Sequence, residues 1–271
     1  MLSISDLKRD QKENKEIYID LNCDLAQSYG IYKNASELDL VDFVSSINIS
    51  CGLHAGDPLT IMNALKIAQE KNLSLGAHVG YPDIQGFGYR QMKLDTEEIQ
   101  ALVLYQIGAL NALAKAYDLQ VDHVRPHGAL YRQAAEDFNI SLSIAKAIAK
   151  YNPWMIYVGA TGENLFKAGE STNIKIAGEL HLDKVYNVDG SINFEVDDKV
   201  NTEYSLELLN LMISKSSVKN KEGGITKVDF CTIHLNTKHQ NSIELARKAK
   251  ETIKNPIPIP VSIIKDTSWI K

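Results

Sequence analysis

Histidines recur in this chain where short apolar runs end. Five of the seven histidines stand at, or just past, the end of a run that reads as a β-strand: His54, His78, His127, His181 and His234. Each run is followed by a helical stretch, and a chain that alternates in this way builds a parallel sheet or a barrel. Ligands bind in such folds where the carboxyl ends of the strands meet, so these imidazoles are expected to converge on one face. The pattern predicts an enzyme.

The first strand-like run, I-Y-I-D-L-N-C-D, carries three polar side chains. A period of two residues places Asp20, Asn22 and Asp24 on one face, opposite the apolar residues. Polar groups that face the inside of a barrel are costly unless they have partners, so the run predicts a ligand or metal site. The alternative is that Asp24 begins a turn or caps the next helix.

The loop C-G-L-H-A-G-D-P combines glycines, a histidine and a helix start. Gly56 allows the backbone to approach a ligand closely. The helix that begins after Asp57 points its free N–H groups at the loop, which suits a carboxylate or a phosphate. Capping of that helix would also explain Asp57 fully. Capping does not explain His54, which is therefore predicted to be functional.

A loop with the segments G-Y-P-D and G-F-G-Y-R follows His78. It runs for about 15 residues, which is long for a connection from a strand to a helix, so it is a candidate lid or binding loop. Arg90 in this loop could clamp a carboxylate with two hydrogen bonds, or form a salt bridge on the surface.

The segment R-P-H-G-A-L-Y places a cation beside a histidine. Arg125 is expected to lower the pKa of the His127 imidazole, and a neutral imidazole can act as a general base near pH 7. His123, two residues before Arg125, is expected to be a structural residue of the strand.

Two further features concern the second half of the chain. Alternation places Glu179, His181 and Asp183 on one side of a strand, although a solvated sheet edge would show the same pattern. His239 lies in a polar helix start and is expected on the surface.

The elements that position these side chains follow a regular order. Four helix starts have clear signals: Asp57-Pro58, Asp95 with Glu98, Asp137, and a last helix over about 240–254. The rhythm of strands and helices is weakest over 181–225. The strand candidates lie at about 16–22, 45–51, 73–79, 121–125, 155–160, 174–180, 228–235 and 258–264.

Composition limits the classes of protein that fit. The chain has 271 residues, 44% of them hydrophobic, and a net charge of −5 without a basic block, which argues against nucleic acid and anionic membranes as partners. No apolar stretch approaches the roughly 20 residues of a membrane-spanning helix, and the charged N-terminus lacks a signal-peptide pattern. Three cysteines in or beside strand-like runs indicate reduced thiols, Cys23, Cys51 and Cys231. We therefore expect a cytoplasmic protein with a polar arm over 1–15 and one α/β barrel domain over 16–271.

Several common catalytic motifs are absent from the sequence. It contains no G-x-x-x-x-G-K-[ST] loop for ATP, no G-x-G-x-x-G after a strand, no G-x-S-x-G elbow, and no H-E-x-x-H or paired C-x-x-C for zinc. Composition and spacing thus indicate a hydrolase-like barrel enzyme with an Asp/His-rich pocket.

The motifs D-L-N-C-D-L, N-I-S-C-G-L-H-A-G-D-P, G-A-H-V-G-Y-P-D, Q-I-G-A-L and R-P-H-G-A-L-Y occur in that order. Together they resemble the family of 5-oxoprolinase A subunits, also called the lactam-utilisation family, over residues 17–240. The resemblance implies a distorted TIM-like (β/α) barrel of seven to eight strands, related to glycoside hydrolase and deacetylase barrels. It also implies ATP-dependent opening of 5-oxo-L-proline to L-glutamate together with the B and C subunits.

The chain departs from the family pattern at several places. Gln27 replaces an acid in D-L-G-E-S, Val79 replaces the proline of G-A-H-P, and Arg125 replaces the lysine of K-P-H-G. Glu179-Leu180-His181-Leu182-Asp183-Lys184 stands for E-V-F-A-D-R. In the late V-H-G-D, Leu235 and Asn236 replace a glycine and an acid, and asparagine cannot serve as a base or an anionic metal ligand.

The residues divide by predicted role. The predicted catalytic residues are His127, His54, His78 and Asp24. The predicted substrate- or phosphate-binding residues are Asn22, Arg125, Gly56, Asp57, Arg90 and Glu179. ATP with Mg²⁺ is the implied cofactor.

Two other hypotheses stay open beside the lactam-opening role. The first is a metal-dependent amide or N-acyl hydrolase that acts alone and holds a divalent metal with Asp24, His54 and His78. The second is a non-catalytic paralogue that binds or assembles, since Gln27, Leu235 and Asn236 mark losses from the family pattern. The sequence also leaves a homo-oligomer open.

Overall fold

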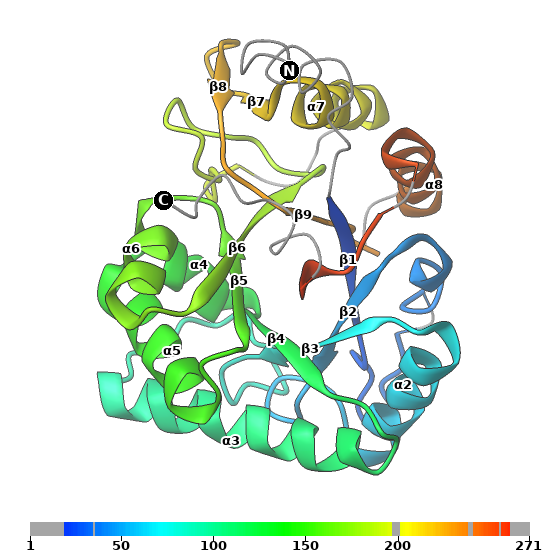
Figure 1. Cartoon of the computed structure of the whole chain (residues 1–271), viewed down its shortest axis with the longest axis vertical. Coiled ribbons are helices and arrows are strands. Elements are labelled where there is room, and N and C mark those ends of the chain that lie inside the picture. The colour runs from blue at the N-terminus through cyan, green and yellow to red at the C-terminus, as the bar shows by residue number, and fades with distance from the viewer. Residues whose placement is uncertain (1–18, 35, 197–200, 238–240, 255, 261–271) are drawn as a thin grey trace, which may run out of the picture.

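Seven parallel strands close into a barrel that is surrounded by helices (Figure 1). The computed structural model describes residues 19–34, 36–196, 201–237, 241–254 and 256–260. The barrel order is β1-β2-β3-β4-β5-β6-β9, and β9 pairs with both β6 and β1. The predicted TIM-like barrel is thereby confirmed. Its strands are β1 Asp20–Leu25, β2 Ser46–Ser50, β3 Ser74–Val79, β4 Val121–Pro126, β5 Ile156–Ala160, β6 Lys175–His181 and β9 Thr232–His234.

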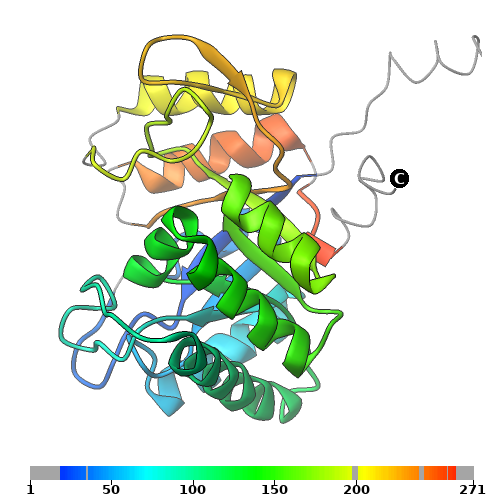
Figure 2. The same cartoon turned by 90° about the vertical axis from the view of Figure 1, so that its left-hand side faces the viewer.

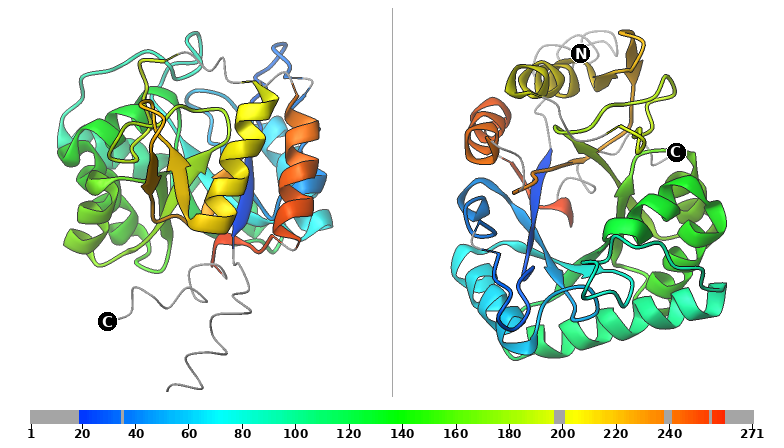
Figure 3. Two further views of the ribbon diagram at one scale, coloured as in Figure 1. Left: turned by 90° about the horizontal axis from the view of Figure 1, so that it is seen from above. Right: turned by 180° about the vertical axis from the view of Figure 1, so that it is seen from behind.

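The helices lie outside the barrel, as Figures 1 and 2 show. The long α3 covers β3 and β4, and α7 lies beside α8, which Figure 3 shows from above. A small antiparallel pair, β7 Ser217–Lys219 and β8 Ile225–Lys227, follows α7. The helices are η1 Val41–Phe43, α2 Pro58–Lys71, α3 Thr96–Lys115, α4 Gly128–Glu136, α5 Phe138–Tyr151, α6 Glu163–Thr172, α7 Thr202–Lys215 and α8 Ser242–Ile253.

The barrel interior is polar where most proteins are apolar. Asn22 of β1 donates hydrogen bonds to Glu179 of β6 and Thr232 of β9, and His123 of β4 contacts Asn48 of β2. The alternate residues of these strands face the helices and form the apolar core. Buried polar groups are tolerated when they are hydrogen-bonded, so the interior works as one connected network.

Cap geometry confirms the predicted starts of α2, α3 and α5, whereas the last helix, predicted over about 240–254, is α8 Ser242–Ile253 and has no side-chain cap. The Asp57 carboxylate accepts from the backbone N–H groups of Leu59 and Thr60 at the start of α2. Asp95 and Glu98 form a capping box at α3. Asp137 accepts from the N–H of Asn139 at α5. These local signals depend on neighbouring residues, which is why the sequence shows them.

Two strand predictions need correction. The first strand begins at Asp20 and continues to Leu25, so Asp24 lies within the strand and does not begin a turn. The strand expected at 258–264 is wrong for its described part, because Ile259 begins a helical turn. Ile259 packs against Ile156, Val158 and Ala177 at the amino-terminal end of the barrel, and its N–H donates to the Ser46 hydroxyl. This apolar segment plugs the barrel instead of adding an eighth strand.

Other expectations fall on different parts of the chain. The arm over 1–15, residues 261–264 of the last predicted strand, and His239 lie outside the described residues. Cys23, Cys51 and Cys231 form no disulfide with one another, as predicted; Cys23 and Cys51 are buried, and Cys231 is partly exposed. Within the described ranges, no helix combines the length and the apolar character needed to cross a membrane.

Candidate active site

A cavity of about 260 Å³ lies over the carboxyl ends of the strands. Asp24, Arg125 and His234 come to it from β1, β4 and β9, and His127 lies directly after β4. The parallel strands bring these residues together although they are far apart in the sequence. The cavity is lined by Asp24, Gln27, Tyr89, Gln91, Arg125, His127, Gly128, Ala129, Tyr131, Arg132, His181, Lys184, Ile192, Phe194, His234 and Asn236.

A larger hollow of about 760 Å³ lies beside α6 and the segment 187–195. Its charged lining is mainly acidic, with Glu136, Glu163, Asp189, Glu195 and Asp229 against Lys227. Among the described residues, no histidine lines it, and none of its carboxylates belongs to a group of three metal-binding side chains that converge on one point. The smaller cavity is therefore the candidate active site.

Three histidines form a compact cluster at one side of this cavity. The rings of His54 and His127 stack with centroids 4.1 Å apart, and His78 meets both rings edge-on. One ring nitrogen from each histidine lies within 4.8 Å of the others. We call His54, His78 and His127 the histidine trio.

The hydrogen bonds of the histidine trio fix where its protons lie. His127 Nε2 is 2.7 Å from the carbonyl oxygen of Phe87, and His78 Nδ1 is 3.1 Å from that of Arg125. A carbonyl only accepts, so both nitrogens carry hydrogen. His127 Nδ1 then presents a lone pair to His78 Nε2, 3.0 Å away, and Asp24 Oδ2 lies 3.2 Å from the same Nε2. Two acceptors meeting at one nitrogen require a second proton on His78 or a bound cation.

The trio fits a metal ion. His54 bonds Ser50 through Nε2, while its Nδ1 is buried without a hydrogen-bond partner among the described residues. A Cβ on Gly80 would come within 2.5 Å of this Nδ1, so the glycine leaves space there. Burial and the neighbouring imidazoles hold the pKa of His54 well below its usual range, which keeps lone pairs available. Imidazole nitrogens suit zinc and similar divalent metals.

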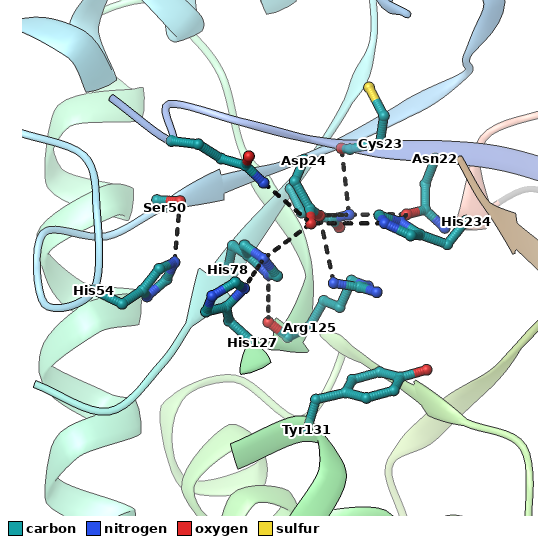
Figure 4. Close-up of polar contacts among 12 residues, drawn as sticks. Asn22, Cys23, Asp24, Ser50, His54, His78, Arg125, His127, Tyr131 and His234 are labelled. Carbon is teal, nitrogen blue, oxygen red and sulfur yellow. Dashed lines mark hydrogen bonds and ion pairs between the residues drawn. The ribbon is translucent and has the colours of Figure 1, made fainter. Parts of the chain in front are cut away.

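The metal ligand set differs from the predicted one. The convergent group is His54, His78 and His127, and the Asp24 carboxylate lies outside it, in contact with His78. His127 thus joins His54 and His78 in the set that could hold a metal. Asp24 contacts Nε2 of His78, whereas Nδ1 of the same ring is held by the Arg125 carbonyl. Figure 4 shows the Asp24 carboxylate and the trio side by side.

Asp24 is ionised in spite of its burial. Its Oδ1 accepts from the Asn48 amide at 3.0 Å and from Arg125 at 3.4 Å. Burial opposes the charge, but the imidazole of His78 and the guanidinium of Arg125 hold the pKa of this carboxyl well below its usual range. Asp24 is therefore an anion that faces both the trio and the cavity.

Glu179 is the second buried anion. Its oxygens accept from Arg125 at 2.8 Å through Nε and at 2.8 Å through Nη2, and from Asn22 and Tyr131. His181 lies 3.1 Å from the same carboxylate. Although burial opposes ionisation, Arg125 and His181 keep the pKa of Glu179 well below its usual range. The strand that carries Glu179 is therefore not a solvated edge.

The structure changes the role of two predicted binding residues. Glu179 and Asn22 are fully buried and do not line the cavity. Glu179 positions Arg125, which does line the cavity, and Asn22 joins Glu179 to Asn48. Both act on a ligand through their neighbours.

The predictions for the glycine-rich loop are also corrected. Asp57 caps α2 and accepts from the N–H of Gly30, and it does not line the cavity. Gly56 has a φ of +84°, and a Cβ there would lie 2.6 Å from the carbonyl oxygen of Ser50. Backbone packing explains the glycine, and capping explains the aspartate.

Arg90 is a structural residue of the loop. Its guanidinium pairs with the buried Asp83 carboxylate, which also accepts from the N–H of Gly86. The Arg90 side chain is 61% exposed and lies outside the cavity lining. Of the two interpretations, the structure favours the salt bridge.

His127 lines the cavity, but both of its ring nitrogens have partners. Burial lowers its pKa to about 3, with smaller contributions from His78 and Arg125, so the predicted neutral state holds. Its lone pair, however, points at His78 and not at a ligand. The geometry therefore disfavours His127 as the base that removes a proton from substrate or water.

His123 lies in the strand body, as predicted. It is fully buried, and its Nε2 lies 2.9 Å from the Asn48 side-chain oxygen. A Cβ on Gly76 would overlap this ring, so the neighbouring strand makes room for it.

Sequence reasoning assigns no role to four residues of this region. His181 and His234 stand out only by their place at strand ends, and alternation along β2 could have indicated Asn48. Tyr131 lies one helical turn into α4, where no sequence signal distinguishes it from a core tyrosine. Its hydroxyl donates to Glu179, and its ring contacts Arg125.

Comparisons with known proteins agree on one group. Residues 19–260 match the model of the LamB/YcsF family. The A subunit of 5-oxoprolinase from Bacillus subtilis (strain 168) is 38% identical over 244 residues, which cover 87% of this chain and 93% of that protein. The corresponding 5-oxoprolinase chain of Geobacillus thermodenitrificans (strain NG80-2) is 35% identical over 240 residues, 88% of this chain and 93% of that protein.

Solved structures give the same picture. The lactam utilization protein from Thermus thermophilus superposes with a TM-score of 0.82 at 31% identity, over 89% of this chain and 99% of that one. A putative cellobiose-phosphate cleavage protein from Enterococcus faecalis V583 shares the barrel fold, with a TM-score of 0.55 at 12% identity over 92% of this chain and 99% of that one.

Proposed function

We propose that this chain, which belongs to the LamB/YcsF family, opens the ring of 5-oxo-L-proline by hydrolysis as the A subunit of a 5-oxoprolinase. The observation that carries the proposal is the cavity at the carboxyl end of the barrel. Ionised Asp24 and Arg125 line it together with His127, His181 and His234. Relatives named for this activity, of which the chain covers more than nine tenths, support the substrate class.

The cavity suits a small charged ring. Its volume of about 260 Å³ lies just below the usual range of about 300–1,000 Å³ for drug-sized ligands. Arg132 and Lys184 line it and add positive charge for the substrate carboxylate. Arg125 lies deeper and can donate to the oxygen on which negative charge develops during ring opening.

ATP would make ring opening favourable, because glutamate recloses to the lactam and a phosphorylated amide oxygen is a good leaving group. The cavity of about 260 Å³ is small for a lactam and a nucleotide together. We therefore assign nucleotide binding to partner subunits of the B and C type, and the lactam site to this chain.

Reconstitution tests the proposal. The chain is combined with candidate B and C subunits from the same organism, and glutamate release from 5-oxoproline is measured with and without ATP. We expect ATP-dependent release that requires all three subunits. Arg125→Met, which keeps side-chain length and removes the charge, is expected to lower turnover by about 100-fold or more. No release with any native pairing would refute the proposal.

The histidine trio favours a second candidate, a metal-dependent amide hydrolase that acts alone. A divalent metal held by His54, His78 and His127 would supply a Lewis acid and an activated water when bound. The Arg125 carbonyl would orient His78 through Nδ1, and the Phe87 carbonyl would orient His127 through Nε2, as partners behind metal ligands usually do.

Metal analysis separates the two candidates. Protein purified without chelators is examined by elemental analysis, and its thermal unfolding is followed with and without added Zn²⁺. If the trio binds metal, Tm rises with Zn²⁺ and the rise disappears in His54→Ala. His123→Gln, a buried histidine outside the trio, is the control that should keep the rise. Activity that depends on metal and needs neither ATP nor partners would replace the first candidate by the second.

A further inference from the structure

His234 ends β9 and lines the cavity. One edge of its ring faces the barrel interior, where Nδ1 lies 2.9 Å from the side-chain oxygen of Asn22. The other ring nitrogen, Nε2, lies 3.7 Å from Asp24 Oδ2. Figure 4 shows the ring with contacts to both residues.

The orientation of the Asn22 amide follows from its neighbours. Its NH₂ group lies 3.0 Å from Glu179 Oε1 and 2.7 Å from the Thr232 hydroxyl oxygen. Glu179 is an ionised carboxylate, which only accepts, so the amide must present NH₂ to it. A flipped amide would place two acceptors against each other in a buried site.

The opposite end of the Asn22 amide is therefore its carbonyl. Both groups that approach it must donate, namely the Asn48 NH₂ at 2.9 Å and His234 Nδ1. His234 thus carries hydrogen on Nδ1. Its Nε2 then holds a lone pair when the ring is neutral.

The charges around His234 keep the ring neutral. Burial and the Arg125 guanidinium lower its pKa to about 3, against the opposing effects of Asp24 and Glu179; His181 also lowers it, with its ring centroid 5.1 Å away. The lone pair of Nε2 and the anionic Oδ2 of Asp24 are thus two acceptors at the cavity wall. A molecule that donates two hydrogens, such as water, satisfies both.

We propose that His234 is the catalytic base that removes a proton from the attacking water, with Asp24 as the second acceptor that holds this water. The proposal rests on the proposed lactam opening. The water oxygen bonds to the carbon of the amide that ATP has phosphorylated, while one water proton moves to Nε2 and on to the ring nitrogen. The C–N bond then breaks as the proton of the new hydroxyl group passes through Nε2 to the same nitrogen, which becomes the amine, and the carbon is left as an acyl phosphate. A second water then releases the phosphate and gives the carboxylate of glutamate. Asn22 is a positioning residue, since its carbonyl holds the Nδ1–H form of the ring.

The arrangement follows the logic of hydrolases in which one group fixes the histidine tautomer and the other ring nitrogen moves the proton. Here a neutral amide does what a carboxylate does in those enzymes. The uncharged amide of Asn22 suits a site that already contains two buried anions, Asp24 and Glu179. A third buried anion would raise the electrostatic cost of folding.

Activity measurements with chemical rescue test the role in catalysis. In the reconstituted three-subunit enzyme, His234→Gly is expected to lower kcat at least about 100-fold, with a smaller change in KM, since general base catalysis contributes about 10²–10⁴-fold. Added imidazole should restore part of kcat in His234→Gly but not in His181→Gly, which opens space in the same cavity. A loss of less than about threefold, or no rescue by imidazole in a variant that unfolds at the temperature of the wild type, overturns the proposal.

A second measurement does not depend on turnover. Nitrogen-15 NMR of histidine-labelled chain, with His234→Gln to assign the signal, reports which ring nitrogen carries hydrogen. We expect a neutral ring protonated on Nδ1 at pH 7. A ring protonated on Nε2 overturns the proposal even if the lactam activity is found. If the wild-type enzyme opens no lactam, the proposed function fails, and an Nδ1–H ring would then support His234 as a base for another substrate of this cavity.

Discussion

The guanidinium of Arg125 lies between the carboxylates of Asp24 and Glu179 inside the barrel. All three groups are nearly or fully buried, and removing one partner of such a set typically costs about 3–5 kcal/mol, because an unpaired charge stays behind. Each of these three residues is therefore needed for charge balance inside the barrel as well as for its role at the cavity. We therefore expect small steric changes next to this network to lower the stability of the fold.

Among the described glycines, Gly76 is the one at which an added Cβ would come closest to another heavy atom. In Gly76→Ala, the new Cβ would overlap the His123 ring at Nε2, so the ring must move and its contact with Asn48 is lost. We expect a loss of about 1–3 kcal/mol in unfolding free energy, as for overpacked cores, and lower turnover because Asn48 also orients Asp24. Urea unfolding measures the first effect. Gly108→Ala is the control: no atom lies within 4 Å of its Cβ in α3, so it should be neutral or stabilise by up to about 1 kcal/mol.

Asn236, where the family pattern has an acid, donates to Asp183 Oδ2 at 2.9 Å. Asn236→Asp would set two carboxylates against each other and raise the pKa of one above its unfolded value. The resulting penalty is present above that raised pKa and vanishes at low pH, where the pair shares a proton. We expect the variant to be less stable than the wild type by about 1–3 kcal/mol at pH 8 and nearly equal near pH 4. Unfolding at both pH values measures this, and equal stability at pH 8 would show that Asp183 is not the partner that matters.

At the scale of elements, the success of prediction depended on how local the signal is. The starts of α2, α3 and α5 are predictable because each is set by a cap within a few residues. The seven barrel strands are predictable within a few residues because each is a buried run. The β7–β8 pair escapes prediction, since each strand has only three residues, too few to show a period, and the side chains of β8 are mostly exposed.

Substitutions of Asp57, which caps α2, can distinguish a structural role of this residue from a role in ligand binding. The pKa of Asp57 is lowered to about 2, chiefly by hydrogen bonds from the N–H groups of Thr60 and Gly30, so the stability from its charge is present above pH 3.8 and is lost as pH falls toward 2. Asp57→Ala should cost about 1 kcal/mol at pH 7. Asp57→Asn keeps a capping oxygen and should cost less. Both should retain normal KM for the lactam, and a KM raised tenfold in Asp57→Asn would return Asp57 to the binding site.

At the scale of the whole molecule, the polar interior of the barrel could not be derived from sequence. Alternation showed which residues share a face of one strand, but not which faces meet across a closed barrel. Asn22, Glu179 and Thr232 come from β1, β6 and β9, so their contacts depend on closure and register. The same holds for Ile259, whose apolar segment looked like a strand and fills the end of the barrel. Predicting the site further would have required the strand order.

This interior makes the stability of the whole chain depend on pH in a specific way. Burial lowers the pKa of His123 to about 3, and burial and Arg125 do the same for His234, from 6.5. Such histidines contribute stability that is present above pH 6.5 and is lost on acidification. Below pH 6.5 these imidazoles bind protons in the unfolded chain but stay neutral in the folded chain. Asp20 acts oppositely: burial raises its pKa from 3.8 to about 7, so the folded chain holds the extra proton in this range.

Burial also lowers the pKa values of His54 and His127, so four histidines oppose Asp20, and unfolding free energy should fall on acidification from about pH 6.5 to 4. Each of these groups contributes up to one proton, or about 1.4 kcal/mol for each pH unit. Asp20→Asn removes the opposing group and should steepen the fall by about this amount. His123→Gln removes one histidine and should make the fall shallower by about the same amount. Urea unfolding of the metal-free chain at half-unit steps of pH measures all three slopes. If Asp20→Asn has the slope of the wild type, Asp20 is ionised in the folded barrel, and its three hydroxyl donors, Ser45, Ser46 and Thr232, outweigh its burial.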